Sequence, residues 1–290
     1  KMQEYFDSKN QPLSVAFKEV SQQELKQGVC VVGASCRYGS CWNLEELDVA
    51  FTGAVDAVTV VPSTRWKWEE NFGPEQSVSK WGTFFVGMAY FDAAFFSISP
   101  REAVAMDPQH RMLLECAWEC VETASMDPGT LKDDHSDASV FVGIQGSEYA
   151  SIAESNSATG TALSTAAGRV SYFFGICGEC LSIDTACSSS LVAIIQGCKG
   201  VERGESSVAL CFGVNAMVDG RVFVVLSQAG MLSPDGRCKT FDAKANGYVR
   251  GEGCGAVMLH PSVEGSLAKL VGHAINQDGR SNGLTAPNGP

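Results

Sequence analysis

The strongest chemical signal in the chain is a cysteine where an apolar segment gives way to helical spacing. Residues 180–183 form a short apolar run, small residues follow it, and helical spacing begins just after Cys187. This pattern predicts a buried strand that turns directly into a helix. A thiol at that junction lies at the positive end of the helix dipole, beside backbone N–H groups without helical partners.

Such a position suits nucleophilic chemistry. The helix terminus stabilises a thiolate, which is the reactive form of cysteine. The same N–H groups can hydrogen-bond the oxyanion that forms when the sulfur attacks an acyl group. Three serines after Cys187 suit a first helical turn, where side-chain oxygens compete for free N–H donors. The alternative interpretation is a buried cysteine chosen for its size at a tight turn.

Eleven further cysteines are spread along the chain, mostly inside apolar stretches. Free cysteine behaves as a small buried hydrophobe, which accounts for most of them. Cys177 and Cys180 form one CxxC pair and leave a redox role open, but no second pair stands at zinc-like spacing. The sequence therefore predicts no metal site and favours a reducing compartment, such as the cytoplasm.

The composition narrows the class of protein further. The chain has 290 residues, 45% of them hydrophobic and 19% charged, with a formal net charge of -12. This balance indicates a globular protein and disfavours a nucleic-acid partner, which would need a basic surface. We expect no membrane span, because no run of 18 or more apolar residues occurs, and we see no targeting segment.

The order of expected elements indicates an α/β protein. Residues 1–27 are polar and are interpreted as an extension or linker, and residues 28–290 form the folded part. Pro100 and Pro108 follow Ser99 and Asp107, which predicts two helix starts. From residue 140 onward, apolar strand-like runs alternate with helical spacing. The apolar stretch at 267–275 closes the series, with a strand-like run at 270–274.

Residues 184–191 (DTACSSSL) resemble the nucleophile motif of β-ketoacyl synthases of the polyketide synthase type. Further blocks resemble the same family in the same order: 30–37 (CVVGASCR), 91–102 (FDAAFFSISPRE), 106–111 (MDPQHR), 167–172 (AGRVSY), 231–242 (MLSPDGRCKTFD), 247–253 (GYVRGEG) and 276–290 (NQDGRSNGLTAPNGP). The likeness covers roughly residues 28–290 and looks like the N-terminal part of such a domain.

The resemblance implies a thiolase-like layered αβαβα fold, here mainly its N-terminal half, and a homodimer. It implies that Cys187 accepts an acyl chain from an acyl carrier protein. A malonyl-type extender would then lose CO₂, and its carbanion would attack the Cys187 thioester. The substrates travel on the phosphopantetheine of the carrier protein, and the resemblance implies no directly bound cofactor. The implied partners are the carrier protein and the rest of the synthase domain or module.

The family also uses two histidines and a lysine, in motifs that we expect beyond Pro290. None of the chain's four histidines stands in such a motif, so we interpret His110, His135, His260 and His273 as structural or surface residues. The fragment alone is therefore expected to be incomplete. Two other functions stay open: a scaffolding or dimerising element without turnover, and a thiol hydrolase or acyltransferase that pairs Cys187 with a histidine of its own.

Overall fold

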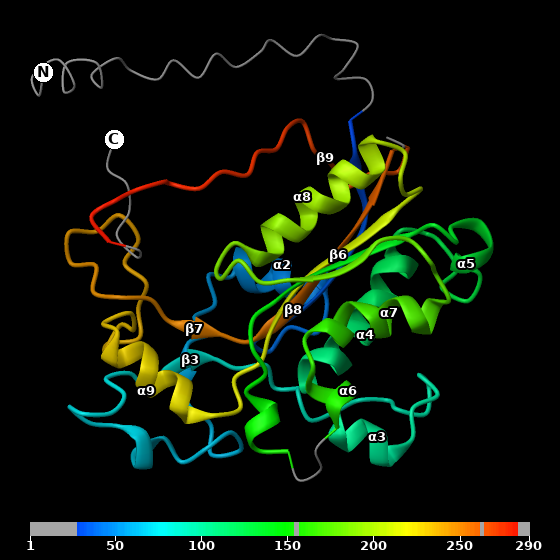
Figure 1. Ribbon diagram of the computed structural model, residues 1–290. Coiled ribbons are helices and arrows are strands. Elements are labelled where there is room, and N and C mark those ends of the chain that lie inside the picture. Colours follow the sequence, from blue (N-terminus) through cyan, green and yellow to red (C-terminus); the bar gives the residue numbers. More distant parts are fainter. Residues whose placement is uncertain (1–27, 154–156, 262–263, 284–290) are drawn as a thin grey trace, which may run out of the picture.

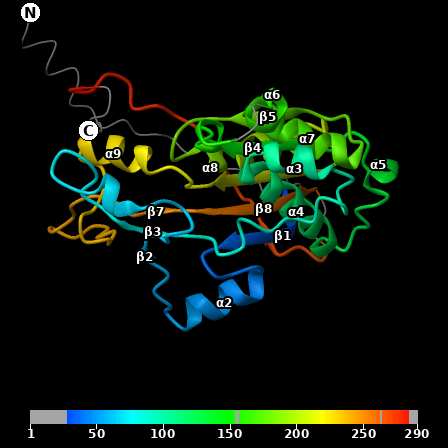
Figure 2. The same cartoon turned by 90° about the horizontal axis from the view of Figure 1, so that it is seen from below.

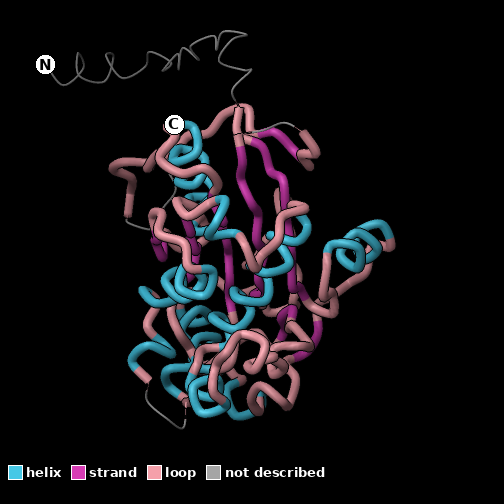
Figure 3. The backbone as a smooth tube through the Cα atoms, turned by 90° about the vertical axis from the view of Figure 1, so that its right-hand side faces the viewer, coloured by secondary structure: helices cyan, strands magenta, loops and turns pink. Residues whose placement is uncertain are grey.

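A six-stranded sheet forms the centre of the computed structural model, which describes residues 28–153, 157–261 and 264–283. The expected extension over residues 1–27 lies outside the described part. The strand order is β5-β4-β6-β8-β1-β9, and the long strands run side by side (Figure 3). The strands are β1 (Cys30–Tyr38), β4 (Ser139–Ile144), β5 (Cys180–Ile183), β6 (Ala209–Asn215), β8 (Gly253–His260) and β9 (Ala268–Lys269).

Strand direction brings several loops to one edge of this sheet. β5, β4 and β6 are parallel neighbours, whereas β8 pairs antiparallel with both β6 and β1. The carboxyl ends of the three parallel strands therefore meet at one edge, and β8 begins at that same edge. Ligands of open α/β sheets bind outside the carboxyl ends of their strands, so this edge is where a site is expected.

Helices cover both faces of the sheet (Figure 1). α4 (Pro108–Thr123) and α7 (Ser164–Phe174) pack on one face, and α8 (Ser189–Glu202) packs on the other. Alternate residues of β4 supply the two apolar clusters between these layers: Val140 and Val142 face α4 and α7, and Phe141 faces the α8 side. Burial on both faces explains why these strands are continuous apolar runs, and the predicted α/β class is confirmed.

Shorter elements surround these layers. A three-stranded sheet in the order β2-β3-β7 lies beside the main sheet, and α2 stands apart beyond β1 (Figure 2). The elements are α2 (Leu44–Thr52), β2 (Thr59–Val60), η2 (Trp68–Asn71), β3 (Trp81–Thr83), α3 (Pro100–Ala105), α5 (Leu131–Asp134), η3 (Tyr149–Ser151), α6 (Ala158–Thr161), α9 (Gly220–Gln228) and β7 (Arg250–Gly251). Within the described ranges, no helix is both long and apolar enough to cross a membrane.

Both predicted helix starts are confirmed. The Ser99 hydroxyl accepts a hydrogen bond from the Glu102 N–H at 3.2 Å, and the Asp107 carboxylate accepts one from the Gln109 N–H at 2.8 Å. Each satisfies a backbone donor that the first helical turn leaves unpaired. In both helices a proline occupies the first turn, where its missing N–H costs nothing.

Two expectations about strands are wrong. β5, expected to be buried, ends the strand order of the described sheet, and its Leu181 is 41% exposed. The apolar stretch at 267–275 yields only the two-residue strand β9, and no helix or strand follows it as far as residue 283. An apolar pattern alone does not say whether a neighbouring strand exists for a segment to pair with.

Two glycines paired across β4 and β6 let the start of α8 approach the sheet closely. Gly143 lies opposite Gly213 in the parallel register. A Cβ added to Gly143 would lie 2.5 Å from the Ser190 backbone nitrogen, and one added to Gly213 would lie 2.5 Å from the Ser190 Cβ. The first turn of α8 therefore rests directly on strand backbone, which sets the position of Cys187 just before it.

We expect Gly143→Ala to lower the free energy of unfolding by about 1–3 kcal/mol, the usual cost of overpacking. The added methyl group meets backbone atoms of Ser189 and Ser190, which cannot move without the helix. Urea unfolding of the purified chain measures the change.

Gly168→Ala in α7 is the matched control, because a Cβ there meets nothing within 4 Å. It should be neutral or stabilise the chain by up to about 1 kcal/mol, since alanine favours helix over glycine. Equal destabilisation by the two substitutions would contradict the close approach of α8.

Candidate active site

Cys187 lies in the turn between β5 and α8, at the carboxyl edge of the parallel strands, and its side chain is exposed. The residue before it, Ala186, has a φ of 56°, in the left-handed region that non-glycine residues avoid. This sharp turn reverses the chain so that the strand passes straight into the helix. The predicted strand-to-helix junction at Cys187 is confirmed.

Ser189 holds this turn together. Its hydroxyl accepts a hydrogen bond from the Thr185 N–H at 2.8 Å and donates one to the Ala186 carbonyl at 2.7 Å. The Asp184 carboxylate accepts a further bond from the Ala186 N–H at 2.9 Å. Because Ser189 is buried, water cannot replace these bonds, and they offset the strain at Ala186.

The serines do not cap the helix as the sequence suggested. Ser188 occupies the N-cap position but makes no side-chain capping bond. Its hydroxyl instead donates to the Thr185 carbonyl at 2.9 Å. Since the hydroxyls of Ser188 and Ser189 turn back toward Thr185, they leave the N–H groups of the first helical turn to other acceptors.

A cleft of about 720 Å³ opens beside Cys187. Its floor is the sheet itself, and Gly143, Gly213 and Gly255 present backbone rather than side chains there. Most of the lining is apolar, and Gln145 and Asn215 add amide groups. A mostly apolar cleft with a few polar groups and one exposed thiol suits an acyl chain attached to sulfur.

Buried carboxylates brace the loops around this cleft. The Glu252 carboxylate accepts hydrogen bonds from the N–H groups of Phe85 at 2.8 Å and Met217 at 3.0 Å, and it pairs with Arg65 through two bonds of 3.0 Å. Burial raises the pKa of Glu252, and the Arg65 guanidinium opposes that shift. Glu252 therefore joins three segments that are distant in sequence.

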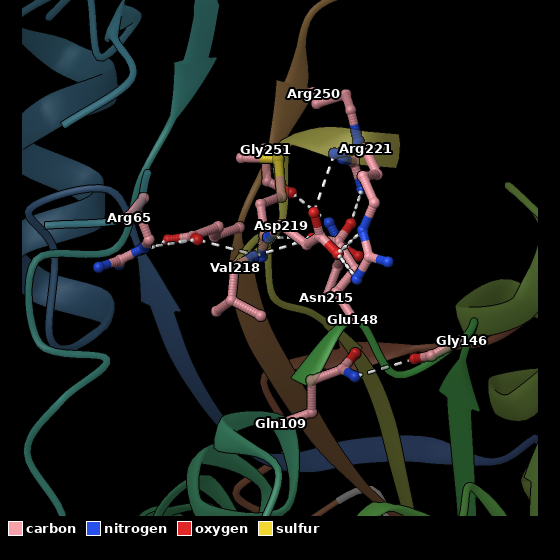
Figure 4. A network of polar contacts seen from close by, with 12 residues as sticks. Arg65, Gln109, Gly146, Glu148, Asn215, Val218, Asp219, Arg221, Arg250 and Gly251 are labelled. Atoms are coloured by element: carbon pink, nitrogen blue, oxygen red, sulfur yellow. Dashed lines mark hydrogen bonds and ion pairs between the residues drawn. The ribbon is translucent and has the colours of Figure 1, made fainter. Parts of the chain in front are cut away.

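Glu148, in the loop after β4, makes a second such link (Figure 4). It accepts bonds from the N–H groups of Val218 at 2.8 Å and Asp219 at 3.0 Å, and from the Arg250 guanidinium at 2.8 Å. Gln109, at the start of α4, donates a hydrogen bond to the Gly146 carbonyl at 3.0 Å and so anchors the same loop to α4. These contacts position the edge loops.

The buried thiols are poor competitors of Cys187 for an electrophile. Burial raises the pKa of Cys36 to about 11 and that of Cys198 to about 12, and it raises the pKa of Cys211 still further. Close to Cys187, burial raises the pKa of the Tyr248 phenol, and the negative charge that Cys187 can carry adds to this shift.

Cys177 and Cys180 are free and exposed, so they are accessible to reagents. Cys177 precedes β5 and Cys180 is its first residue, so both lie before the turn that carries Cys187. The redox role left open for this pair is not tested by these observations.

None of the four histidines lines the cleft at Cys187. His110 lies inside α4 and is buried there, and burial lowers its pKa to about 4. His135 and the Ser207 hydroxyl form a hydrogen bond of 2.9 Å. The His135 ring lies near the ring of His260, the last residue of β8, at the edge of the sheet opposite the cleft. His273 pairs with Glu202.

Comparison with known proteins agrees with this geometry. Residues 26–264 match the model of the β-ketoacyl synthase N-terminal domain. The chain belongs to the β-ketoacyl synthase family. The ketosynthase from module 6 of the bacillaene synthase of Bacillus subtilis superposes with a TM-score of 0.83 at 35% identity, over 90% of this chain and 46% of that one. The predicted thiolase-like fold is confirmed.

Relatives in the family are far longer. The chain is 41% identical to a phenolphthiocerol/phthiocerol polyketide synthase chain of Mycobacterium tuberculosis over 95% of its own length, but spans 19% of that protein. It is 42% identical to polyketide synthase GfsA of Streptomyces halstedii and spans 4% of it. A ketosynthase domain of Streptomyces albus superposes with a TM-score of 0.83 at 31% identity, over 90% of this chain and 48% of that one.

Sequence reasoning found the cysteine but missed the residues that shape the turn and brace the loops around the cleft. Ala186 and Ser189 stand inside the quoted motif, and Glu252 stands inside the block at 247–253, so each was part of a recognised motif without being singled out. Neither a left-handed φ nor a bond between segments more than a hundred residues apart has a local pattern in the sequence.

We expect a thioester-mimicking electrophile to label Cys187 first among the twelve thiols, because it combines exposure with the helix terminus. Ser189→Ala should slow this labelling roughly tenfold, equivalent to about 1.4 kcal/mol, by leaving the Thr185 N–H unpaired and loosening the turn. Peptide mapping by mass spectrometry follows each cysteine over time.

Ser188→Ala is the matched control, since water can replace the partners of an exposed hydroxyl, and it should change the rate little. Preferential labelling of Cys36, Cys177 or Cys180 with Cys187 untouched would contradict the assignment. Equal rates for the two serine variants would show that the Ser189 bonds do not set the position of the thiol.

Proposed function

We propose that Cys187 is the acyl-accepting nucleophile of a ketosynthase domain of a polyketide synthase. The observation that carries the proposal is an exposed thiol at a braced strand-to-helix turn, opening on an apolar cleft of about 720 Å³. Residues 28–290 would form the N-terminal part of that domain, preceded by an extension over residues 1–27.

The first step of this function is thioester exchange. The Cys187 sulfur bonds to the acyl carbon of a thioester on the phosphopantetheine of an acyl carrier protein. The bond from that carbon to the carrier's sulfur breaks, and the Cys187 proton passes to the departing thiolate, so atoms and charge balance. N–H groups at the start of α8 can hydrogen-bond the oxyanion that forms between the two steps.

The second step is condensation. A malonyl-type extender on a carrier protein loses CO₂, and the carbanion formed attacks the Cys187 thioester to give a β-ketoacyl chain and the free thiol. This step needs donors that stabilise enolate charge within hydrogen-bond reach of the extender. Since no histidine of the chain lines the cleft, we assign condensation to a complete ketosynthase domain, of which residues 28–290 would be the N-terminal part.

The partners follow from this assignment: an acyl carrier protein, the remainder of the synthase, and a second copy of the chain. β5 supports self-association, because it ends the described sheet and exposes Leu181. A strand edge of this kind presents unpaired backbone groups to another strand.

A second candidate function is a scaffold without turnover. It is favoured by the cleft lining, which contains no histidine among the residues that the structure describes. The two functions differ in whether Cys187 takes an acyl group at all.

We expect the 290-residue chain to be acylated at Cys187 but to form no β-ketoacyl product. An assay with acyl- and malonyl-loaded carrier protein reads the two outcomes separately by mass spectrometry. Cys187→Ala should abolish acylation, and Cys177→Ser is the control that should retain it. Product formed by this chain alone, and lost in Cys187→Ala, would refute the division of steps. An unacylated but folded chain would favour the scaffold.

We also expect the chain to self-associate through β5. Leu181→Lys should weaken this association at least about tenfold, because a charge at a strand edge disfavours pairing. Sedimentation velocity over a range of concentrations measures it. Leu267→Lys, at an exposed leucine next to β9 on the other edge of the sheet, should leave it unchanged. A wild-type chain that stays monomeric throughout would contradict the proposal.

A further inference from the structure

Three side chains with metal-binding atoms converge at the C-terminal end of α8, away from the Cys187 cleft. Cys198 and Glu202 are one helical turn apart on α8, so they share a face, and His273 comes from the segment after β9. The Cys198 sulfur, a Glu202 carboxylate oxygen and a His273 ring nitrogen all lie within 4.8 Å of one another. None of the three lines the cleft.

The spacing fits a tetrahedral ion. Zinc bonds to sulfur, nitrogen and oxygen at about 2.0–2.3 Å, which places ligand atoms about 3.4 Å apart. The His273 Nε2 and Glu202 Oε2 atoms are 3.1 Å apart. In the part of the chain that the structure describes, this is the one group of three such ligands whose atoms lie that close together.

The charges at this point also favour a cation. Glu202 is the last residue of α8, at the negative end of the helix dipole, where a carboxylate is unfavourable and a cation is favourable. His273 offsets the Glu202 charge only when its ring is protonated. Cys198 is 1% exposed at the border of the apolar cluster under α8, whereas the Glu202 side chain is 42% exposed, so the group is closed on one side and open to solvent on the other.

We propose that Cys198, Glu202 and His273 bind one Zn²⁺ ion, with water as the fourth ligand. The mixed sulfur, nitrogen and oxygen donor set selects a borderline-soft ion over Mg²⁺ or Ca²⁺, which prefer oxygen alone. On binding, the Cys198 thiol releases its proton to solvent, and the thiolate and carboxylate offset the charge of the ion.

The ion would tie the segment after β9 to the end of α8. The Leu270 N–H donates to the Val29 carbonyl at 2.8 Å, and beyond it no helix or strand holds the described chain through residue 283. A bond to His273 would add a fixed point three residues further along. The role of the site is therefore structural, and it acts on the helix whose other end begins just after Cys187.

Cobalt(II) is the probe for this site, because a thiolate ligand adds a sulfur-to-cobalt charge-transfer band and a tetrahedral site adds visible bands. We expect the metal-stripped 290-residue chain to bind one Co²⁺ with both signals, and Zn²⁺ to displace it. Cys198→Ser should abolish the charge-transfer band. Glu202→Gln and His273→Ala should each weaken Zn²⁺ binding at least about 100-fold. Loss of a residue that only hydrogen-bonds a metal ligand costs up to about 100-fold in metal affinity, and loss of the ligand itself should cost at least as much.

Three matched controls identify the source of the signal. Cys177→Ser and Cys187→Ser remove exposed thiols elsewhere, and His135→Gln removes a histidine that has another imidazole nearby. All three should keep the cobalt spectrum and the Zn²⁺ affinity. Circular dichroism confirms that each variant is folded, because an unfolded chain with twelve thiols would itself bind metal.

The proposal is overturned if the folded wild-type chain shows no charge-transfer band, or if the band survives Cys198→Ser. It is equally overturned if Glu202→Gln and His273→Ala both bind Zn²⁺ as tightly as the wild type.

Discussion

The close contact between the first turn of α8 and the sheet is the constraint on which the site depends. Gly143 and Gly213 lie opposite each other on β4 and β6, and their missing side chains let Ser190 rest on strand backbone. Because α8 begins there, the turn before it must reverse within a few residues. That requirement accounts for the left-handed φ of Ala186 and for the exposure of Cys187 at the sheet edge.

Carboxylates brace the loops around the thiol by accepting backbone hydrogen bonds. Glu252 and Glu148 each accept two main-chain N–H bonds and pair with an arginine. Irregular loops leave many backbone donors unpaired, and a buried carboxylate can satisfy two at once while its charge is matched by the guanidinium. The polar groups around Cys187 can therefore hold the loops in place, while the thiol alone is available for chemistry.

α8 connects two parts of the molecule with different roles. Its N-terminal end faces Cys187 and offers positive potential, and its C-terminal end carries Cys198 and Glu202 at negative potential. On the proposed assignments, the dipole of this one helix would favour a thiolate at its N-terminal end and a cation at its C-terminal end. Gly197 continues the close packing between them, since a Cβ there would lie 2.4 Å from the Cys211 sulfur. The helix is thus held against the sheet along its length.

The sequence by itself determined the α/β class, both proline-led helix starts, the family and the position of Cys187 at a strand-to-helix junction, because each has a local signal in residue order. Only the tertiary structure decided that β5 is an edge strand, that Glu252 braces segments far apart in the chain, and that His273 meets Cys198 and Glu202. Scanning for paired cysteines could not find that last group, since its third member is 71 residues from the second. Such contacts depend on how separate elements pack against one another. The sequence holds no periodic pattern or fixed residue spacing from which that packing could be recognised.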